Sequence, residues 1–208
     1  MDNCPRWEGP ESDLQLPDVV AGLERVHQFI RRKAPRYILR HGDIKNWHLT
    51  VFTSVVPLSY YAGNYRSDDP NFPCLNVNVQ VSLNAGALFA QVPGLMSQFS
   101  DTVLDAVKKT DDYLRGGASE LNRVRAVVQL AAFSMGRFVQ IHPFLNGNGR
   151  MCRMIGNYVM ERYGFPSLMW PPFVRPAGEY EVASEACMRG NFTLMSRYLI
   201  GALALQTA

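Results

Sequence analysis

The chain contains the stretch His142-Pro143-Phe144-Leu145-Asn146-Gly147-Asn148-Gly149-Arg150-Met151-Cys152-Arg153, whose residue types predict a site for acid–base chemistry next to an anion site. It lies between two segments with helical patterns of apolar residues. Pro143 cannot continue the first helix, so it fixes the direction in which His142 points. An imidazole titrates near neutral pH and can accept a proton from a hydroxyl group. His142 is therefore a candidate general base.

The second half of the same stretch predicts an anion site. The run Gly147–Gly149 comes directly before a helix, where free backbone N–H groups and the helix dipole favour phosphate. Three polar residues of that helix are spaced by three and seven positions and so share one face. They are Arg150, Arg153 and Asn157. Guanidinium groups match phosphate oxygens, so the pattern predicts a cradle for a triphosphate.

Outward from this stretch, apolar residues recur every three or four positions, which predicts a compact all-α domain over residues 18–208. The helix over 121–139 is apolar on nearly all sides, so we expect it at the centre of the domain. Residues 1–17 are rich in proline and acidic residues and predict an extended arm. The other expected helices cover 18–33, 41–53, 93–109, 149–163 and 180–203.

One segment follows a different period. Apolar and polar residues alternate strictly from Leu75 to Ser82, which is typical of a half-exposed strand. An isolated strand needs a partner, so we expect a small hairpin over about 73–84 at the edge of the helical body. Its open side could accept an extended segment of another protein.

Composition and charge narrow the function classes. The net charge of +3 is scattered, which argues against nucleic-acid binding. No stretch approaches 18 consecutive apolar residues, so no membrane-spanning helix is expected. The N-terminus has no secretory pattern, so we expect a cytoplasmic protein, with export as an effector by another route left open. Four widely spaced cysteines predict neither a zinc site nor disulfides: Cys4, Cys74, Cys152 and Cys187.

The motif over 142–153 resembles the signature of the Fic (filamentation induced by cAMP) family, HPFx[D/E]GNGRxxR, at every defining position except Asn146. The similarity extends over about 45–205. It includes Trp47-His48-Leu49, the loop 62–66, the lead-in 138–141 and the spacing of Tyr180, Ala183, Ala186, Gly190 and Asn191. The resemblance implies a Fic fold: a helical bundle with a β-hairpin flap.

The resemblance also implies residue roles. His142 would deprotonate a target hydroxyl, Asn148 and the glycines beside it would hold phosphates, and Arg150 and Arg153 would bind the β- and γ-phosphates. The implied activity is transfer of AMP from ATP to a Tyr, Thr or Ser side chain of a target protein, with release of pyrophosphate and help from Mg²⁺ or Mn²⁺. The flap residues that would dock the target by strand addition are Leu75, Asn76, Val77, Asn78, Val79 and Gln80.

Asn146 departs from the family pattern, which has Asp or Glu at this position as a magnesium ligand. An amide oxygen lacks the full charge of a carboxylate, so we expect Asn146 to bind the metal weakly. Three hypotheses follow. The chain is an active adenylyltransferase, a weak or inactive Fic-fold binding module paired with an antitoxin, or an enzyme that transfers UMP, phosphocholine or phosphate.

The N-terminal segment contains a possible inhibitory sequence. Many Fic proteins carry an inhibitory [S/T]xxxE[G/N] segment, and the nearest match here is Cys4–Gly9, which makes Glu8 a candidate inhibitor. The alternatives are a solvated acidic arm, or a separate antitoxin or homo-oligomer partner that supplies the inhibiting Glu. For Arg66 we expect capping or ion pairing rather than ligand contact, and for His48 a packing or surface role.

Overall fold

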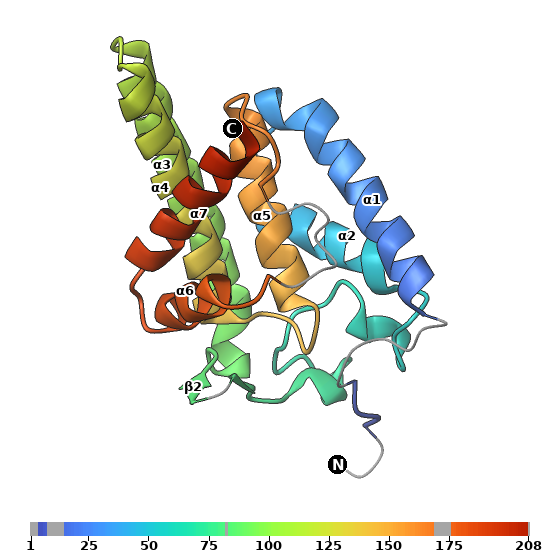
Figure 1. Cartoon of the computed structure of the whole chain (residues 1–208). Coiled ribbons are helices and arrows are strands. Elements are labelled where there is room, and N and C mark those ends of the chain that lie inside the picture. Colours follow the sequence, from blue (N-terminus) through green and yellow to red (C-terminus); the bar gives the residue numbers. More distant parts are fainter. Residues whose placement is uncertain (1–3, 8–14, 82, 169–175, 208) are drawn as a thin grey trace.

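The computed structural model describes residues 4–7, 15–81, 83–168 and 176–207. They form a helical body with one small hairpin, which confirms the all-α prediction (Figure 1). The α-helices are α1 (Leu16–Lys33), α2 (His41–Phe52), α3 (Val92–Arg115), α4 (Glu120–Ile141), α5 (Asn148–Arg162), α6 (Glu179–Met188) and α7 (Thr193–Thr207). Short 3-10 turns are η1 (Ala34–Arg36), η2 (Ser59–Tyr61), η3 (Pro73–Leu75) and η4 (Phe89–Gln91).

The centre of the body is α4, as its apolar pattern predicts. It packs against α3, α5, α6 and α7, while α1 and α2 cover the other side of α5 (Figure 1). α4 and α5 run in opposite directions and meet at the loop 142–147. The fully buried residues on these two helices include Val127, Ala131, Met135, Phe138, Met151, Ile155 and Val159. The loop that carries the motif is therefore fixed at the end of the most buried helix pair.

Two helix boundaries differ from the prediction. α3 continues to Arg115, because the polar residues after Lys109 form a solvent-exposed extension that ends only at Gly116. The segment expected as one helix over 180–203 is two helices, α6 and α7. Gly190 has a φ of +82° and breaks the helix, and the Asn191 side chain then accepts a hydrogen bond from Thr193 N.

The hairpin is present but much shorter than predicted. β1 (Gln80–Val81) pairs antiparallel with β2 (Asn84–Ala85), with Gln80 opposite Ala85 and Val81 opposite Asn84. Leu75 is not on a strand: it ends η3 and is fully buried. Residues 76–79 have no strand assignment, because the Val77 carbonyl binds Arg66 instead of a strand.

The described part of the N-terminal arm corrects a second expectation. Cys4 forms a disulfide with Cys74, 70 residues further along the chain, so these two thiols are not reduced. Trp7 packs edge-on against His48 and Phe52 and stacks on Tyr61. The arm at residues 4–7 therefore lies on the core, whereas Cys152 and Cys187 are buried free thiols. Glu8 lies outside the described residues.

None of the described helices has the length and apolar character to cross a lipid bilayer.

Candidate functional site

His142 lies immediately after the last residue of α4 and has a left-handed backbone, with a φ of 51° and a ψ of 60°. Among the described residues it is the only non-glycine with positive φ, a conformation that costs about 1–2 kcal/mol. Its N–H still donates to the Phe138 carbonyl, at 3.0 Å. Pro143 follows, so the helix ends here as predicted. Such strain at a candidate catalytic residue must be compensated by its surroundings.

The imidazole of His142 faces a cavity of about 600 Å³. The hairpin contributes Val81 and Asn84 to its wall, and α5 contributes Asn148, Gly149 and Arg153. The remaining lining residues are Val139 of α4 and a run from α6: Tyr180, Glu181, Val182, Ser184, Glu185 and Met188. The cavity thus brings together the candidate base, part of the predicted anion site and the flap.

The pKa of His142 is lowered to about 4, first by burial and then by the positive charge of Arg66. The backbone of Val139 acts weakly in the opposite direction. At neutral pH the imidazole is therefore uncharged and able to accept a proton.

The turn before α5 closes on itself through Asn148. Its side-chain oxygen accepts a hydrogen bond from Phe144 N at 2.9 Å, and its amide nitrogen donates to the Phe144 carbonyl at 2.8 Å. Gly147 has a φ of +78°, and a Cβ there would lie 2.4 Å from the Phe52 ring, so only glycine fits. The side chain of Asn148 shapes the loop, and the first N–H groups of α5 are the groups that a phosphate could meet.

Arg153 is the predicted phosphate-binding arginine that lines the cavity. It is almost fully buried, and its guanidinium lies close to Gly149, since a Cβ at Gly149 would be 3.5 Å from Nη1. Arg150 lies elsewhere, over the Phe52 ring at 5.7 Å, and Asn157 is fully buried outside the lining. The structure therefore brings Arg153 to His142 but not Arg150 or Asn157.

Asn146 does not line the cavity either. Its side-chain oxygen accepts a hydrogen bond from Gly147 N at 2.6 Å, and its amide nitrogen donates to the Trp7 carbonyl at 3.3 Å. Within the described ranges, no group of three or more His, Cys, Asp or Glu side chains could hold a metal ion. One engaged amide oxygen does not fit a magnesium ion held by the chain itself.

His48 of α2 contacts the motif loop 142–147 through Asn146 and Phe144. Its Nδ1 accepts from Gly63 N at 2.9 Å, so Nε2 carries the proton and donates to the Asn146 carbonyl at 3.0 Å. Its ring stacks on Phe144 with centroids 3.7 Å apart. Burial lowers the pKa of His48 to about 3, which keeps it neutral. His48 is a packing residue, as expected, but with a specific role in holding Asn146 and Phe144.

The predicted flap residues lie beside the cavity, not in it. Asn76, Val77, Asn78 and Gln80 are exposed, and the Asn78 side chain accepts from Phe89 N. Leu75 is buried away from them. The exposed positions leave a surface on which a target segment could dock.

Sequence reasoning missed the α6 wall of the cavity. Tyr180 is nearly fully buried, and Glu181 and Glu185 follow on the same helical face at a spacing of four. That spacing was the available signal, but a pair of glutamates on a helix is more often a solvated surface. Arg66 binds only backbone carbonyls in the described structure, including that of His142 at the end of α4, which agrees with the capping role expected for it.

The sequence model of the Fic/DOC family matches residues 38–160, which include the motif over 142–153 and the hairpin but not α6. This chain belongs to the Fic/DOC family. It is 38% identical over 82 residues to a Fido domain-containing protein of Dictyostelium discoideum, covering 39% of this chain and 51% of that protein. It is 33% identical over 72 residues to protein adenylyltransferase fic-1 of Caenorhabditis elegans, covering 35% of this chain but 14% of that protein. The aligned part of the chain thus spans about half of the first relative and a smaller share of the second.

Solved Fic structures share the fold of this Fic chain. A Fic domain containing signaling protein from Bacteroides thetaiotaomicron superposes with a TM-score of 0.65 at 20% identity, covering 96% of this chain and 74% of that one. BepC, a VirB-translocated effector from Bartonella tribocorum with bound AMPPNP, superposes with a TM-score of 0.62 at 14% identity, covering 96% and 92%. At these identities the likeness shows the fold alone.

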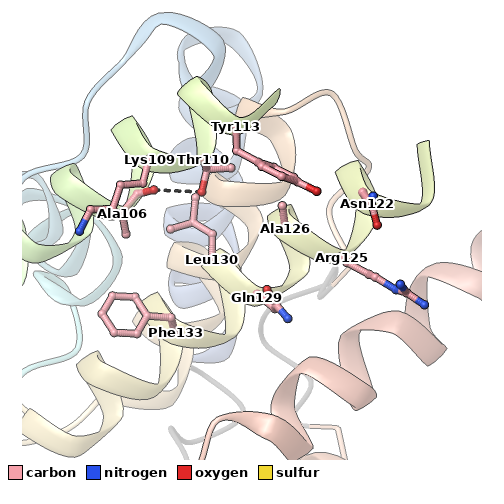
Figure 2. A pocket seen from close by; sticks show the side chains of 10 residues that line it. All are labelled: Ala106, Lys109, Thr110, Tyr113, Asn122, Arg125, Ala126, Gln129, Leu130 and Phe133. Atoms are coloured by element: carbon pink, nitrogen blue, oxygen red, sulfur yellow. Dashed lines mark hydrogen bonds between the residues drawn. The ribbon is translucent and has the colours of Figure 1, made fainter. Parts of the chain in front are cut away.

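A second cavity of this Fic domain, of about 550 Å³, lies between α3 and the first half of α4 (Figure 2). Lys109 and Tyr113 of α3 face Arg125, Gln129 and neighbouring residues of α4 across it. It lies toward the opposite end of α4 from His142, so it is not part of the candidate site.

Proposed function

We propose that this Fic domain is a protein adenylyltransferase, which transfers AMP from ATP to a hydroxyl side chain of a target protein. The observation that carries the proposal is a single cavity that holds a neutral His142, the first turn of α5 at Gly149, and the buried Arg153. Family membership and relatives named protein adenylyltransferases support the choice of chemistry.

The proposed reaction uses these groups in order. A target hydroxyl gives its proton to the neutral imidazole of His142, and its oxygen attacks the α-phosphorus of ATP. The bond from the α-phosphorus to the bridging oxygen breaks, and pyrophosphate leaves. The N–H groups at the start of α5 and the Arg153 guanidinium stabilise the negative charge on the phosphates. The negative charge of ATP also raises the pKa of His142 and makes it a stronger base.

The flap supplies the target in this proposal. Val81 of β1 and Asn84 of β2 line the cavity that holds His142, so an extended segment added to the edge of this hairpin would bring a Tyr, Thr or Ser hydroxyl to the imidazole. A metal ion would enter with ATP and be held by its phosphates, because Asn146 is engaged by Gly147 and Trp7.

The same engagement of Asn146 favours a second candidate function, a catalytically weak Fic module that binds nucleotide or an antitoxin without transfer. Incubation of the protein with ATP, Mg²⁺ or Mn²⁺ and cell lysate, followed by mass spectrometry, separates the two. We expect protein adducts with the mass of one AMP, absent in His142→Ala. Tight ATP binding without any adduct would support the binding module, and an adduct of another mass would indicate a different transferred group.

A further inference from the structure

Arg66 lies where the flap meets the C-terminal end of α4. It is fully buried, and its guanidinium donates five hydrogen bonds to four backbone carbonyls. Nε and Nη2 reach the His142 carbonyl at 3.0 and 2.8 Å, and Nη2 also reaches the Ile141 carbonyl at 3.1 Å. On the flap side, Nη1 reaches the Val77 carbonyl at 3.0 Å and Nη2 the Ala87 carbonyl at 2.9 Å.

A buried guanidinium without a carboxylate partner is costly, so its position calls for a physical explanation. Within the described structure, the acceptors around Arg66 are dipoles rather than charges, and burial lowers the pKa of Arg66 to about 10. Two of them, Ile141 and His142, are at the C-terminal end of α4, where the helix dipole is negative. Only the planar, forked guanidinium offers enough donors to reach all four carbonyls at once.

The contacts tie both ends of the flap to the candidate base. Val77 precedes β1 and Ala87 follows β2, so the hairpin is held on either side by the same side chain. Backbone bonds reinforce the junction: Ala87 N donates to the Ile141 carbonyl at 3.2 Å, and Arg66 N donates to the Pro143 carbonyl at 2.8 Å.

The residues at the junction of the flap and α4 are closely packed around Gly86. A Cβ built on Gly86 would lie 3.0 Å from His142 Cβ, 3.0 Å from Val79 Cγ2 and 3.3 Å from Arg66 Nη2. There is therefore no room for a side chain at position 86 between the flap backbone, the candidate base and the guanidinium that holds its carbonyl. A small shift of any one of these groups moves the others.

We propose that Arg66 is a positioning residue that couples the flap to His142, so that a hydroxyl aligned on the flap meets the imidazole at one fixed distance. The inference rests on the proposed adenylyltransferase function. Arg66 does not line the cavity that would hold the phosphates, so it acts on the geometry of transfer and not on nucleotide binding. Misplacement by about 1 Å can lower a rate by roughly 100-fold.

The test uses two variants of the junction and one matched control. Arg66→Lys keeps the positive charge but removes the forked guanidinium. Gly86→Ala keeps arginine at position 66 but adds a methyl group that crowds His142, Val79 and Arg66. The control is Arg162→Lys. Arg162 is a partly buried arginine at the far end of α5 that, like Arg66, donates to a backbone carbonyl, that of Tyr37, and it also pairs with Asp111. Each variant is measured for AMP transfer to lysate protein, ATP affinity and amide hydrogen exchange.

We expect both junction variants to lose roughly 100-fold in transfer rate with ATP affinity changed less than about twofold. Exchange should become faster at the amides of Gly86 and Ala87, which bond Val79 and Ile141, but not in the middle of α4. Arg162→Lys should change neither the transfer rate nor the amide exchange of Gly86 and Ala87. If Arg66→Lys does not fold, Gly86→Ala decides the test by the same readouts.

Normal transfer in a folded junction variant would overturn the proposal, and so would a parallel loss of ATP affinity. Unchanged exchange at Gly86 and Ala87 would overturn it as well. Failure of the proposed function gives a different result: the wild type itself transfers nothing, while the exchange data still decide whether Arg66 couples the flap to α4.

Discussion

Among the individual residues, Asn146 is the one that we expect to limit metal binding to the ATP complex. Its amide oxygen is shared with Gly147 N, and it bears no net charge. A carboxylate would add a full negative charge at the same place. Replacing Asn146 with Asp should therefore strengthen metal binding to the ATP complex, although it removes the amide that donates to the Trp7 carbonyl.

We expect Asn146→Asp to raise Mg²⁺ affinity in the presence of ATP by about tenfold, the size of one charge-assisted contact. Calorimetric titration of Mg²⁺ into the ATP-bound wild type, Asn146→Asp and Asn146→Ala measures this. Equal affinities of the wild type and the Asp variant would contradict this account of position 146.

The buried histidines make stability depend on pH. The pKa of His48 is about 3 in the folded protein, well below its ordinary value near 6.5 in an unfolded chain. Below pH 6.5 the unfolded state binds the proton and the folded state does not, so the stability contribution is full above pH 6.5 and is lost as pH falls toward 3. His142, with its pKa near 4, acts in the same direction.

Between pH 7 and pH 5, His48 alone should remove about 2 kcal/mol from the free energy of unfolding. His48→Gln keeps a donor and an acceptor but cannot titrate, so its unfolding free energy should be lower at pH 7 and fall less on acidification. Urea unfolding of both proteins at the two pH values checks this. An equal loss in wild type and variant would show that His48 titrates normally.

At the element scale, the motif loop is the part that the sequence predicted best. The helix on either side of it, the end at Pro143 and the buried character of α4 all follow from local patterns. The split between α6 and α7 was missed, although Gly190 and Asn191 carried the signal, because apolar periodicity continues across them. A helix can continue through a single glycine, so the apolar pattern alone does not show whether the helix breaks there.

The flap and the ligand face of α5 show where sequence patterns fail. Alternation over 75–82 predicted a strand, but tertiary contacts decide the outcome, since Arg66 takes the Val77 carbonyl and Leu75 enters a separate apolar cluster. The spacing predicted that Arg150 and Arg153 share one face of α5; Arg153 lines the cavity, and the Arg150 guanidinium lies over the Phe52 ring. Long-range carbonyl contacts, such as those of Arg66, leave no local pattern.

At the scale of the whole molecule, the N-terminal arm is joined to the body by the disulfide between Cys4 and Cys74. Spacing alone could not predict the pair, because 70 residues separate the two cysteines and the fold brings their Cα atoms to 5.4 Å. Trp7, three residues after Cys4, packs against His48 and accepts a hydrogen bond from Asn146. The disulfide therefore helps to hold the arm against the motif loop.

We expect the disulfide to stabilise the fold by up to about 4 kcal/mol, the loop-entropy value for this separation. Thermal unfolding with and without dithiothreitol measures it: the reductant should lower the melting temperature of the wild type but leave that of Cys4→Ser unchanged. Peptide mapping without reduction should recover the linked peptides. Four titratable thiols in the unfolded, unreduced protein would contradict the bond.

In the proposed reaction, one cavity holds the α-phosphate of ATP beside a neutral His142. A paired labelling assay tests this arrangement, with ATP labelled at the α-phosphate in one tube and at the γ-phosphate in the other. We expect the wild-type protein to transfer the α label but not the γ label to protein, and His142→Ala to transfer neither label. Transfer of the γ label, or α label that persists in His142→Ala, would contradict it.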